Sequence, residues 1–341
     1  NQIQEALSAV DELDKGIQAA ERRLAEAIQQ KLSDITRPTA DFVEERGNPY
    51  KALLDYKIED APFCYGRSAA IVAMREKLGQ SHLTILHSDS GSGKSSLLQA
   101  GLASRLLADG HFPLYLRPYD QRPDQTIKKA LLPDYATQED LSRFSDERMT
   151  LKGFLERLTY YLGDQRLIIF LDQFEEFFTE LTPEQQEEFS KQLRACIESD
   201  LAVWWVLAVR KEYFSDLRLF SALKPFENEY FLPTFKLDEA QEVIVEPAAL
   251  KEAGYEVGLV DQILDDISQG AAEIPPAQVQ LVCYTLFDEL PGNGGGSGIR
   301  PSRTITFDLY NEPRGRSPGA PGAEGILTSH LSRVLDRELK G

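Results

Sequence analysis

Residues 87–102 of the chain read HSDSGSGKSSLLQAGL, and this stretch decides the fold. An apolar run at 83–86 precedes it, and a helix-forming run begins at Ser96. A strand, a glycine-rich turn, Gly-Lys-Ser and a helix are together typical of a phosphate-binding P-loop. Gly91 and Gly93 let the backbone curl so that several N–H groups converge, and the helix adds the positive end of its dipole. The pattern therefore predicts a site for nucleotide phosphates.

The P-loop pattern assigns the chemistry of ATP or ADP with Mg²⁺ to particular side chains. Lys94 reaches the β- and γ-phosphates, and the Ser95 hydroxyl ligates Mg²⁺. One position departs from the pattern, because Ser88 stands where a glycine is usual. Serine tolerates positive φ poorly, so we expect the turn to close differently at its first residue. The remaining predicted contacts to nucleotide come from Ser90, Gly91, Ser92, Gly93 and Ser96.

A second stretch, LIIFLD at 167–172, is followed by QFEE. An unbroken apolar run indicates a strand buried on both faces of a parallel sheet, and such sheets bind ligands at the carboxyl ends of their strands. Asp172 is therefore predicted to be the Walker B carboxylate that holds Mg²⁺. Either Glu175 or Glu176 is predicted to orient the attacking water, and we favour Glu176.

Arg210 ends another apolar run, WWVLAV at 204–209. An arginine at the carboxyl end of a parallel strand is suited to neutralising a γ-phosphate, and the alternative is a surface ion pair with Glu212. The aromatic residues near these motifs are expected in the core: Tyr160, Tyr161, Phe174, Phe177 and Phe178.

Two further candidates lie outside the strands. Arg67 follows Gly66 and an aromatic pair, and we expect it either to bind nucleotide or to hold a hinge. Pro275 is predicted either to touch adenine or simply to begin a helix.

The order of apolar patterns divides the chain into four parts. Residues 1–36 read as an amphipathic helix with a heptad pattern, which is either a coiled coil or a helix packed on its own globule or linked to a missing N-terminal part. Residues 37–235 alternate strands and helices, which indicates a parallel sheet. Residues 236–290 read as a helical lid without strands. Residues 291–341 begin with the flexible run PGNGGGSG and end in a helix near 324–338.

The composition narrows the classes of protein. The chain has 341 residues, a net charge of −18 and 42% hydrophobic residues, which predicts folded cores and opposes non-specific binding to nucleic acid. No apolar run is long enough to span a bilayer. The three cysteines lack metal-ligand spacing, so a reducing cytoplasmic setting is expected. Because the chain begins at Asn1, we interpret it as a piece of a longer protein.

The chain resembles a STAND-class P-loop NTPase of the bacterial group called novel STAND NTPases, over residues 49 to 341. The resemblance implies an α/β P-loop NTPase sheet with helical layers, then a helical lid and the start of a winged helix. Six segments carry it: FCYGR at 63–67, GSGKSSLL at 91–98, DQFEEFF at 172–178, VLAVR at 206–210, IPPAQ at 274–278 and GAEGIL at 322–327.

The resemblance also implies a nucleotide-gated switch. STAND proteins typically rest with ADP, exchange it for ATP when a sensor domain binds its ligand, self-associate, and activate an effector, often in antiviral defence. Effector and sensor would lie outside this chain. Two alternatives stay open: an AAA+ motor or DNA loader that uses the winged helix, and a non-catalytic scaffold in which Ser88 marks a degraded loop.

Overall fold

The computed structural model describes residues 47–119, 122–131, 149–160, 162, 164–290, 303–312 and 321–338. The predicted helix at 1–36 and the predicted flexible run at 291–298 lie outside these residues. The described chain divides into two compact units. The sheet unit contains Ala73–His87 and Ala103–Phe231, and the helical unit contains Ser88–Leu102 with the described residues before 73 and after 231.

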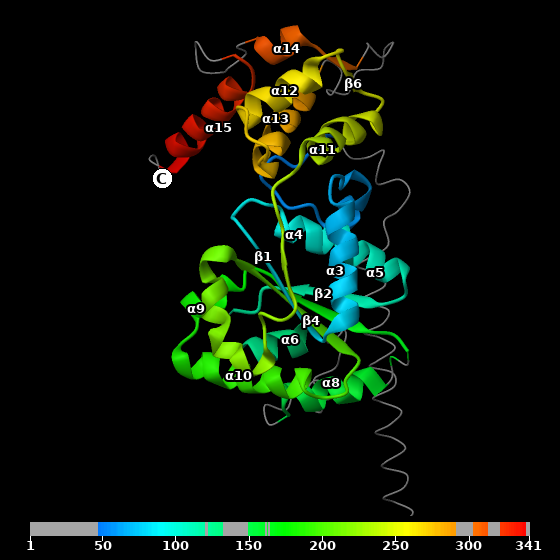
Figure 1. Ribbon diagram of the computed structural model, residues 1–341, viewed down its shortest axis with the longest axis vertical. Coiled ribbons are helices and arrows are strands. Elements are labelled where there is room, and N and C mark those ends of the chain that lie inside the picture. Colours follow the sequence, from blue (N-terminus) through cyan, green and yellow to red (C-terminus); the bar gives the residue numbers. More distant parts are fainter. Residues whose placement is uncertain are drawn as a thin grey trace, which may run out of the picture. The chain divides into compact units, whose positions relative to one another are not determined.

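The sheet unit is built on one five-stranded parallel sheet in the order β2-β3-β4-β1-β5 (Figure 1). The alternation of strands and helices predicted for this part of the chain is thereby confirmed. Because the strands are parallel, the carboxyl ends of β1, β4 and β3 lie side by side at one edge. The strands are β1 (Leu83–Ser88), β2 (Phe112–Leu116), β3 (Leu167–Leu171), β4 (Val203–Arg210) and β5 (Glu229–Phe231).

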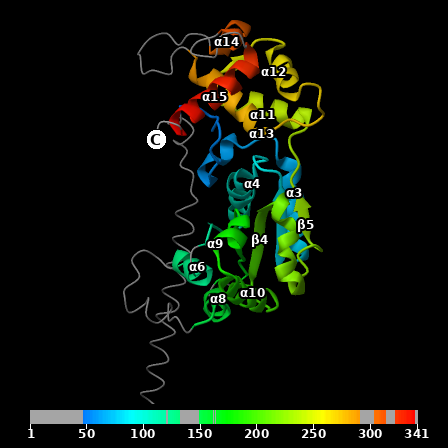
Figure 2. The ribbon, with the colours of Figure 1, turned by 90° about the vertical axis from the view of Figure 1, so that its left-hand side faces the viewer.

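The middle of this sheet is apolar on both faces, as the unbroken hydrophobic runs predict. All five residues of β3 are buried, and Trp205 on β4 is fully buried. Helices α6, α8 and α10 pack on one another (Figure 2). The helical elements along this part of the chain are α3 (Ser68–Gln80), α5 (Ser104–Ala108), α6 (Pro123–Leu131), α8 (Leu151–Tyr160), α9 (Glu175–Glu180), α10 (Pro183–Ile197) and the 3₁₀ segment η3 (Lys211–Leu223).

The prediction of an aromatic core was wrong at Tyr160, whose exposed fraction is 81%. Helix α8 buries the stripe Leu151, Phe154, Leu155 and Leu158, and the last residue of the helix falls on its opposite side. The prediction is confirmed for Phe174 and Phe177, which are fully buried, while Phe178 is half-buried and Tyr161 lies outside the described residues.

The helical unit has a separate apolar core, with α12 and α13 at its centre. Helix α11 packs on both of them, and so does α15. The elements of this unit are the 3₁₀ turn η1 (Ile58–Phe63), α4 (Lys94–Ser96), the π-helical segment η2 (Leu97–Ala103), α11 (Leu237–Ala249), α12 (Leu259–Ser268), α13 (Pro276–Asp288), α14 (Phe307–Asn311) and α15 (Gly322–Glu338). None of the described helices is both long and apolar enough to cross a membrane.

The prediction that 236–290 has no strands was wrong. Strand β6 (Gly254–Tyr255) pairs in parallel with β7 (Thr304–Ile305). Two residues carry too little alternation to be recognised as a strand from the sequence. Helix α15 begins at Gly322 and packs within the same helical core. The start of a winged helix at this position stays a prediction.

Candidate functional site

The P-loop begins where β1 ends at Ser88. Gly91 and Gly93 have positive φ values of 76° and 86°, the conformation that glycine adopts without strain. Ser88 is not among the residues with positive φ, so the serine at this position does not strain the backbone. A Cβ atom placed on Gly93 would meet no atom within 4 Å. The loop therefore has open space beside its amides, which fits a phosphate group.

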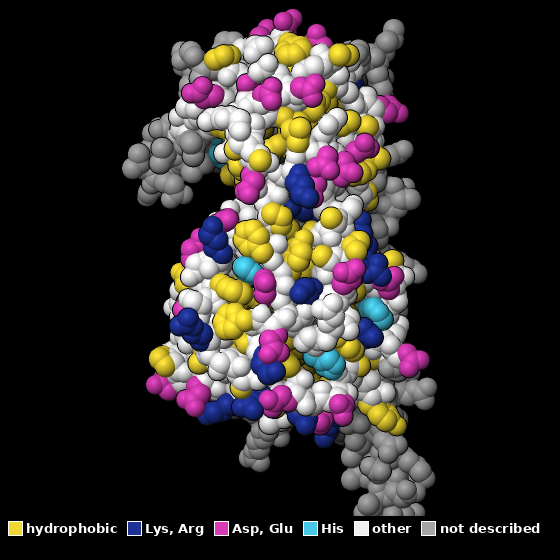
Figure 3. All heavy atoms as spheres, viewed as in Figure 1, with side chains coloured by type: hydrophobic (Ala, Val, Ile, Leu, Met, Phe, Trp, Pro, Cys, Tyr) yellow, Lys and Arg dark blue, Asp and Glu magenta, His cyan; other side chains and the backbone are white. Residues whose placement is uncertain are grey.

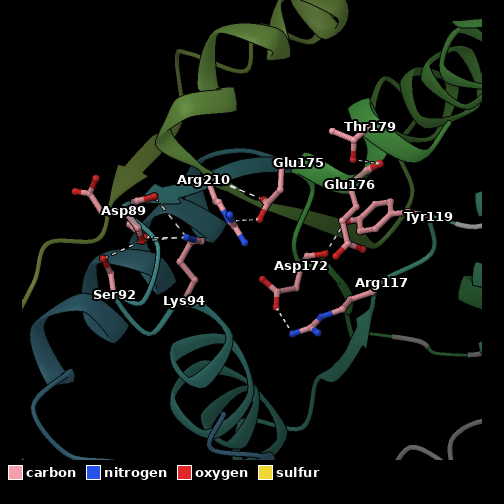
Figure 4. A network of polar contacts seen from close by, with 11 residues as sticks. Asp89, Ser92, Lys94, Arg117, Tyr119, Asp172, Glu175, Glu176, Thr179 and Arg210 are labelled. Atoms are coloured by element: carbon pink, nitrogen blue, oxygen red, sulfur yellow. Dashed lines mark hydrogen bonds and ion pairs between the residues drawn. The ribbon is translucent and has the colours of Figure 1, made fainter. Parts of the chain in front are cut away.

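Lys94, the first residue of α4, turns back over the start of the loop (Figure 4). Its Nζ donates to Ser88 Oγ at 3.0 Å and lies 3.4 Å from the Asp89 carbonyl oxygen. The serine that departs from the glycine pattern thus supplies an acceptor that holds the lysine at the loop. A bound phosphate would compete with these neutral acceptors for the ammonium group.

The serines of the loop differ in their surroundings. Ser90 is exposed, whereas Ser92 is buried and donates through Oγ to the Asp89 carbonyl at 3.0 Å. Ser95 is half-buried in the first turn of the helix, where a hydroxyl can reach a metal bound to phosphate. Ser96 Oγ instead accepts the backbone N–H of Tyr56 at 3.1 Å. Its hydroxyl therefore also holds the segment that precedes α3.

Arg67 joins the P-loop to the segment that leads into α11. It is buried, and its guanidinium donates to the carbonyl oxygens of Ser92 at 2.7 Å and of Pro233 at 3.0 Å. The same group lies 4.1 Å from the centre of the Phe235 ring. Of the two roles predicted for Arg67, these contacts favour the hinge.

Gly66 lies directly against α11. Its φ is 71°, and a Cβ atom at this position would come within 2.6 Å of the Glu239 carbonyl oxygen and of Val243 Cγ2. Its backbone N–H donates to Glu242 Oε2 at 3.1 Å. Only glycine fits this approach of the chain to the helix.

The amino end of α13 lies near the P-loop. Pro275 is the N-cap of this helix, and the Ala277 methyl group is 3.8 Å from where a Gly91 Cβ would stand. The backbone of Ile274 forms two hydrogen bonds with that of Phe235, at 2.9 and 3.0 Å. The predicted helix start at Pro275 is confirmed, and it lies within the helical unit that also holds the P-loop.

Asp172 follows β3 at the carboxyl edge of the sheet and is fully buried. The Tyr115 hydroxyl donates to its Oδ2 at 2.5 Å. Arg117 Nη2 donates to the same oxygen at 3.2 Å (Figure 4). Tyr119 donates to its backbone carbonyl oxygen at 2.7 Å. Burial, followed by the charge of Asp172, raises the pKa of Tyr115, so its hydroxyl stays a donor at neutral pH.

These three partners of Asp172 were not identified from the sequence. The available signal was the position of Arg117 just after β2, because β2 and β3 are neighbours whose carboxyl ends meet. Mg²⁺ fits this edge chemically, since it binds one or two oxygen side chains together with phosphate, and Asp172 supplies such an oxygen.

The chain turns sharply after Asp172. Gln173 has a φ of 53°, which is uncommon for a residue with a side chain. The Phe174 N–H then donates to the Ala208 carbonyl of the adjacent strand at 2.8 Å. The Phe174 ring stacks on Phe177 with centroids 4.9 Å apart. This anchoring fixes the start of α9 and therefore the positions of Glu175 and Glu176.

The two glutamates have different environments. Glu175 is buried and forms an ion pair with Arg210, with Nε 2.9 Å from Oε1. Glu176 is half-buried, and its side chain forms no ion pair within the described part of the chain. Burial raises the pKa of Glu176, Arg117 opposes that shift, and the charge of Glu175 adds to it. The alternative considered for Arg210, a surface ion pair with Glu212, names the wrong partner, because the ion pair is formed with Glu175.

Comparison with known proteins agrees with this fold. Two similar solved structures are the Walker-type ATPase PABY2304 of Pyrococcus abyssi and the ORC2 protein of Aeropyrum pernix in ADPNP and ADP complexes. The first is 14% identical with a TM-score of 0.50, covering 71% of this chain and 72% of that one. The second is 12% identical with a TM-score of 0.50, covering 79% and 69%. At these identities the likeness shows a shared fold.

No curated protein matches the chain. The family described as novel STAND NTPase 1 matches residues 49–291. This match covers most of the chain and includes the P-loop, Asp172 and the amino end of α13. The protein is therefore a nucleotide-binding P-loop NTPase that belongs to the novel STAND NTPase 1 family.

Proposed function

We propose that this chain is the nucleotide-dependent switch of a larger signalling protein. It binds ATP or ADP with Mg²⁺, hydrolyses ATP slowly, and self-associates in the ATP state to activate an effector, in bacterial antiviral defence. Effector and sensor domains belong to other parts of the protein in this proposal. The family supplies the NTPase chemistry. The contacts within the helical unit support the switch.

In this proposal Lys94 and the amides after Gly91 hold the β- and γ-phosphates. Ser95 and Asp172 hold Mg²⁺, which when bound supplies positive charge to the phosphate oxygens. Glu176 accepts a proton from the attacking water as general base. Its half-buried carboxylate, which forms no ion pair within the described part of the chain although the charge of Arg117 acts on it, suits that role better than the ion-paired Glu175.

The observation that carries the switch is the set of contacts made by Arg67. One buried guanidinium contacts Ser92 in the P-loop, and Pro233 and Phe235 in the segment that leads to α11. A change in the loop that moves the Ser92 carbonyl must therefore either shift that segment or break a charged hydrogen bond, at a cost of about 1.5–3 kcal/mol. Binding at the P-loop thus biases the position of the lid helices.

Arg210 is the proposed reader of the γ-phosphate. Its side chain is 48% exposed, so a phosphate can reach it without unfolding of the strand. The guanidinium is paired with Glu175 in this structure, and a γ-phosphate would compete with that carboxylate for it. In this proposal the Arg210 guanidinium changes its partner from the Glu175 carboxylate to the γ-phosphate, and these two pairings are the two arrangements that a switch requires.

Exposed apolar side chains at the edge of the sheet support self-association. Phe226 and Phe231 both have exposed fractions of 43%, and β5 is an edge strand. His87 stacks on Phe214 with ring centroids 4.0 Å apart. Figure 3 shows hydrophobic side chains gathered around a histidine on this face. We propose this edge as part of the contact between copies.

Nucleotide binding in the Lys94→Ala variant tests the proposal. Calorimetry is expected to show loss of tight ATP and ADP binding with the fold intact. Lys191→Ala is the matched control, because Lys191 is an exposed lysine on α10 paired only with its helix neighbour Glu187 in the described residues. Unchanged nucleotide affinity in Lys94→Ala would contradict the P-loop assignment. Binding without any hydrolysis by the wild type would favour the non-catalytic scaffold.

A further inference from the structure

A pocket lies in the sheet unit at the amino ends of the strands, the edge opposite the carboxyl ends where Asp172 and Arg210 lie. Its volume is about 130 Å³. His111 precedes β2, Arg166 precedes β3, and Trp204 is the second residue of β4. The lining residues are Arg75, Leu78, Gly79, Leu106, Asp109, His111, Arg166, Ile168 and Trp204.

The walls of this pocket combine an apolar body with cationic groups. Leu78, Leu106, Ile168 and the Trp204 indole supply apolar surface. The Arg166 guanidinium lies 4.4 Å from the centre of the Trp204 ring, and that ring is also in contact with His82, with centroids 4.6 Å apart. Histidine, basic and acidic side chains lie together over the lower end of α3 (Figure 3).

The polar groups at the pocket are mostly hydrogen-bond donors. Asp109 is the only acidic residue of the lining, and its charge is paired with Arg75 at 2.5 Å. The His111 Nδ1 atom accepts a long hydrogen bond of 3.5 Å from the backbone N–H of Arg166. A neutral imidazole that accepts at Nδ1 carries its proton on Nε2, so the ring too is a donor. Two guanidiniums and an imidazole N–H favour an anionic ligand.

We propose that this pocket binds a small organic anion with a flat apolar body, such as an aromatic carboxylate. An apolar cavity of about 150 Å³ holds benzene, so the 130 Å³ of this pocket is close to the size of one six-membered ring. The ring contacts the aliphatic side chains and the edge of Trp204, because Arg166 and His82 lie against the indole ring, while the anionic group contacts Arg166 and His111. The chain has a net charge of −18 and so repels anions in general, whereas this local group of cationic and N–H donors attracts one.

His111 provides a readout of this binding that does not involve the ATPase. Burial, followed by the charges of Arg166 and Arg75, lowers its pKa, and the charge of Asp109 opposes them. A bound anion favours the imidazolium, so it must raise the pKa of His111. By linkage, the anion then binds more tightly as the pH falls through that pKa.

The test is a titration of the chain with benzoate, followed by the imidazole resonances of its four histidines. Benzamide is the neutral analogue of the same shape, and inorganic phosphate is an anion without the apolar body. We expect benzoate to bind at millimolar concentration or better, to shift His111 and His82, and to raise the pKa of His111. Benzamide and phosphate are expected to bind at least about tenfold more weakly, since each lacks one of the two contributions.

Arg166→Gln separates the pocket from general effects on the fold. Arg166 is exposed, so its replacement should leave the sheet intact, and benzoate affinity is expected to fall about tenfold. Arg194→Gln is the control, because Arg194 is an exposed arginine paired with Glu198 on α10. Equal shifts with benzoate and benzamide, no shift of His111, or unchanged affinity in Arg166→Gln would each overturn the proposal. ATP binding at Lys94 is expected to be unaffected in every case.

Discussion

Arg210 holds Glu175 by two contacts. Its backbone N–H donates to Oε2 at 3.1 Å, and its side-chain Nε lies 2.9 Å from Oε1. Both oxygens of the first glutamate after the Walker B strand are therefore engaged by one residue of the neighbouring strand. This relationship separates the roles of the two glutamates, because it leaves Glu176 as the carboxylate suited to accept a proton.

Replacing Glu176 with glutamine is expected to slow ATP hydrolysis by about hundredfold or more, since a positioned general base contributes about 10²–10⁴-fold. ATP affinity is expected to stay within a few-fold, because Glu176 contacts no phosphate in this account. Single-turnover hydrolysis and calorimetry measure the two effects. Glu175→Gln is the paired variant, and a greater loss of hydrolysis there than in Glu176→Gln would reverse the assignment.

The pH dependence of hydrolysis follows from the raised pKa of Glu176, which burial causes first and the charge of Glu175 reinforces. The carboxylate acts as a base only when deprotonated, so the rate falls as the pH drops through this pKa. Because the pKa lies above the usual value of a glutamate, the loss begins at a higher pH than for an ordinary carboxylate. A kcat profile whose acidic limb is the same in Glu176→Gln as in wild type would contradict this.

Replacing Arg210 with glutamine is expected to lower the affinity for a non-hydrolysable ATP analogue by about tenfold. The affinity for ADP should change little, because ADP lacks the γ-phosphate. It also leaves the buried Glu175 without its counter-charge, which should cost about 1–3 kcal/mol of stability. Calorimetry with both nucleotides and chemical denaturation measure these effects. Arg210→Lys keeps the charge and is expected to lose less. Equal losses for ATP and ADP would show that the arginine does not read the γ-phosphate.

Gly66→Ala is expected to destabilise the helical unit by about 2–4 kcal/mol, because the new Cβ would stand 2.6 Å from the Glu239 carbonyl at a φ of 71°. Gly79→Ala is the control with the opposite sign. A Cβ at Gly79 in helix α3 meets no atom within 4 Å, so alanine there should raise the free energy of unfolding by about 0.5–1 kcal/mol. Denaturant unfolding gives both values. A neutral Gly66→Ala variant would contradict the close packing on α11.

The strands and the P-loop could be predicted from the sequence because their signals are local. The apolar runs predicted at 83–86, 167–171 and 204–209 correspond to strands β1, β3 and β4 of the sheet. The helices at α3, α6 and α9 were not predicted. Their apolar positions are few or their length is short, and their boundaries depend on packing against the rest of the fold.

The partners of the site residues could not be predicted, because they come from strand order and from contacts distant in sequence. Arg210 meets Glu175, not the nearer Glu212, since β3 and β4 are neighbours and the residues that follow each strand come together. Arg67 is bonded to a residue 166 positions later in the chain. Ser88 looked like a defect of the motif, yet its hydroxyl holds Lys94.

The central claim is that the nucleotide at the P-loop sets the state of this portion of the protein. Small-angle scattering of the chain with ADP and with a non-hydrolysable ATP analogue, each saturating with Mg²⁺, tests it most directly. A shift from 1% to 99% active molecules needs about 5.5 kcal/mol of differential binding. Because the proposed sensor lies outside this chain, a partial shift of the population with nucleotide alone is enough to support the claim. We predict larger dimensions or mass with the analogue, and no difference between nucleotides in Lys94→Ala. Identical dimensions and mass with both nucleotides in the wild type would contradict the account.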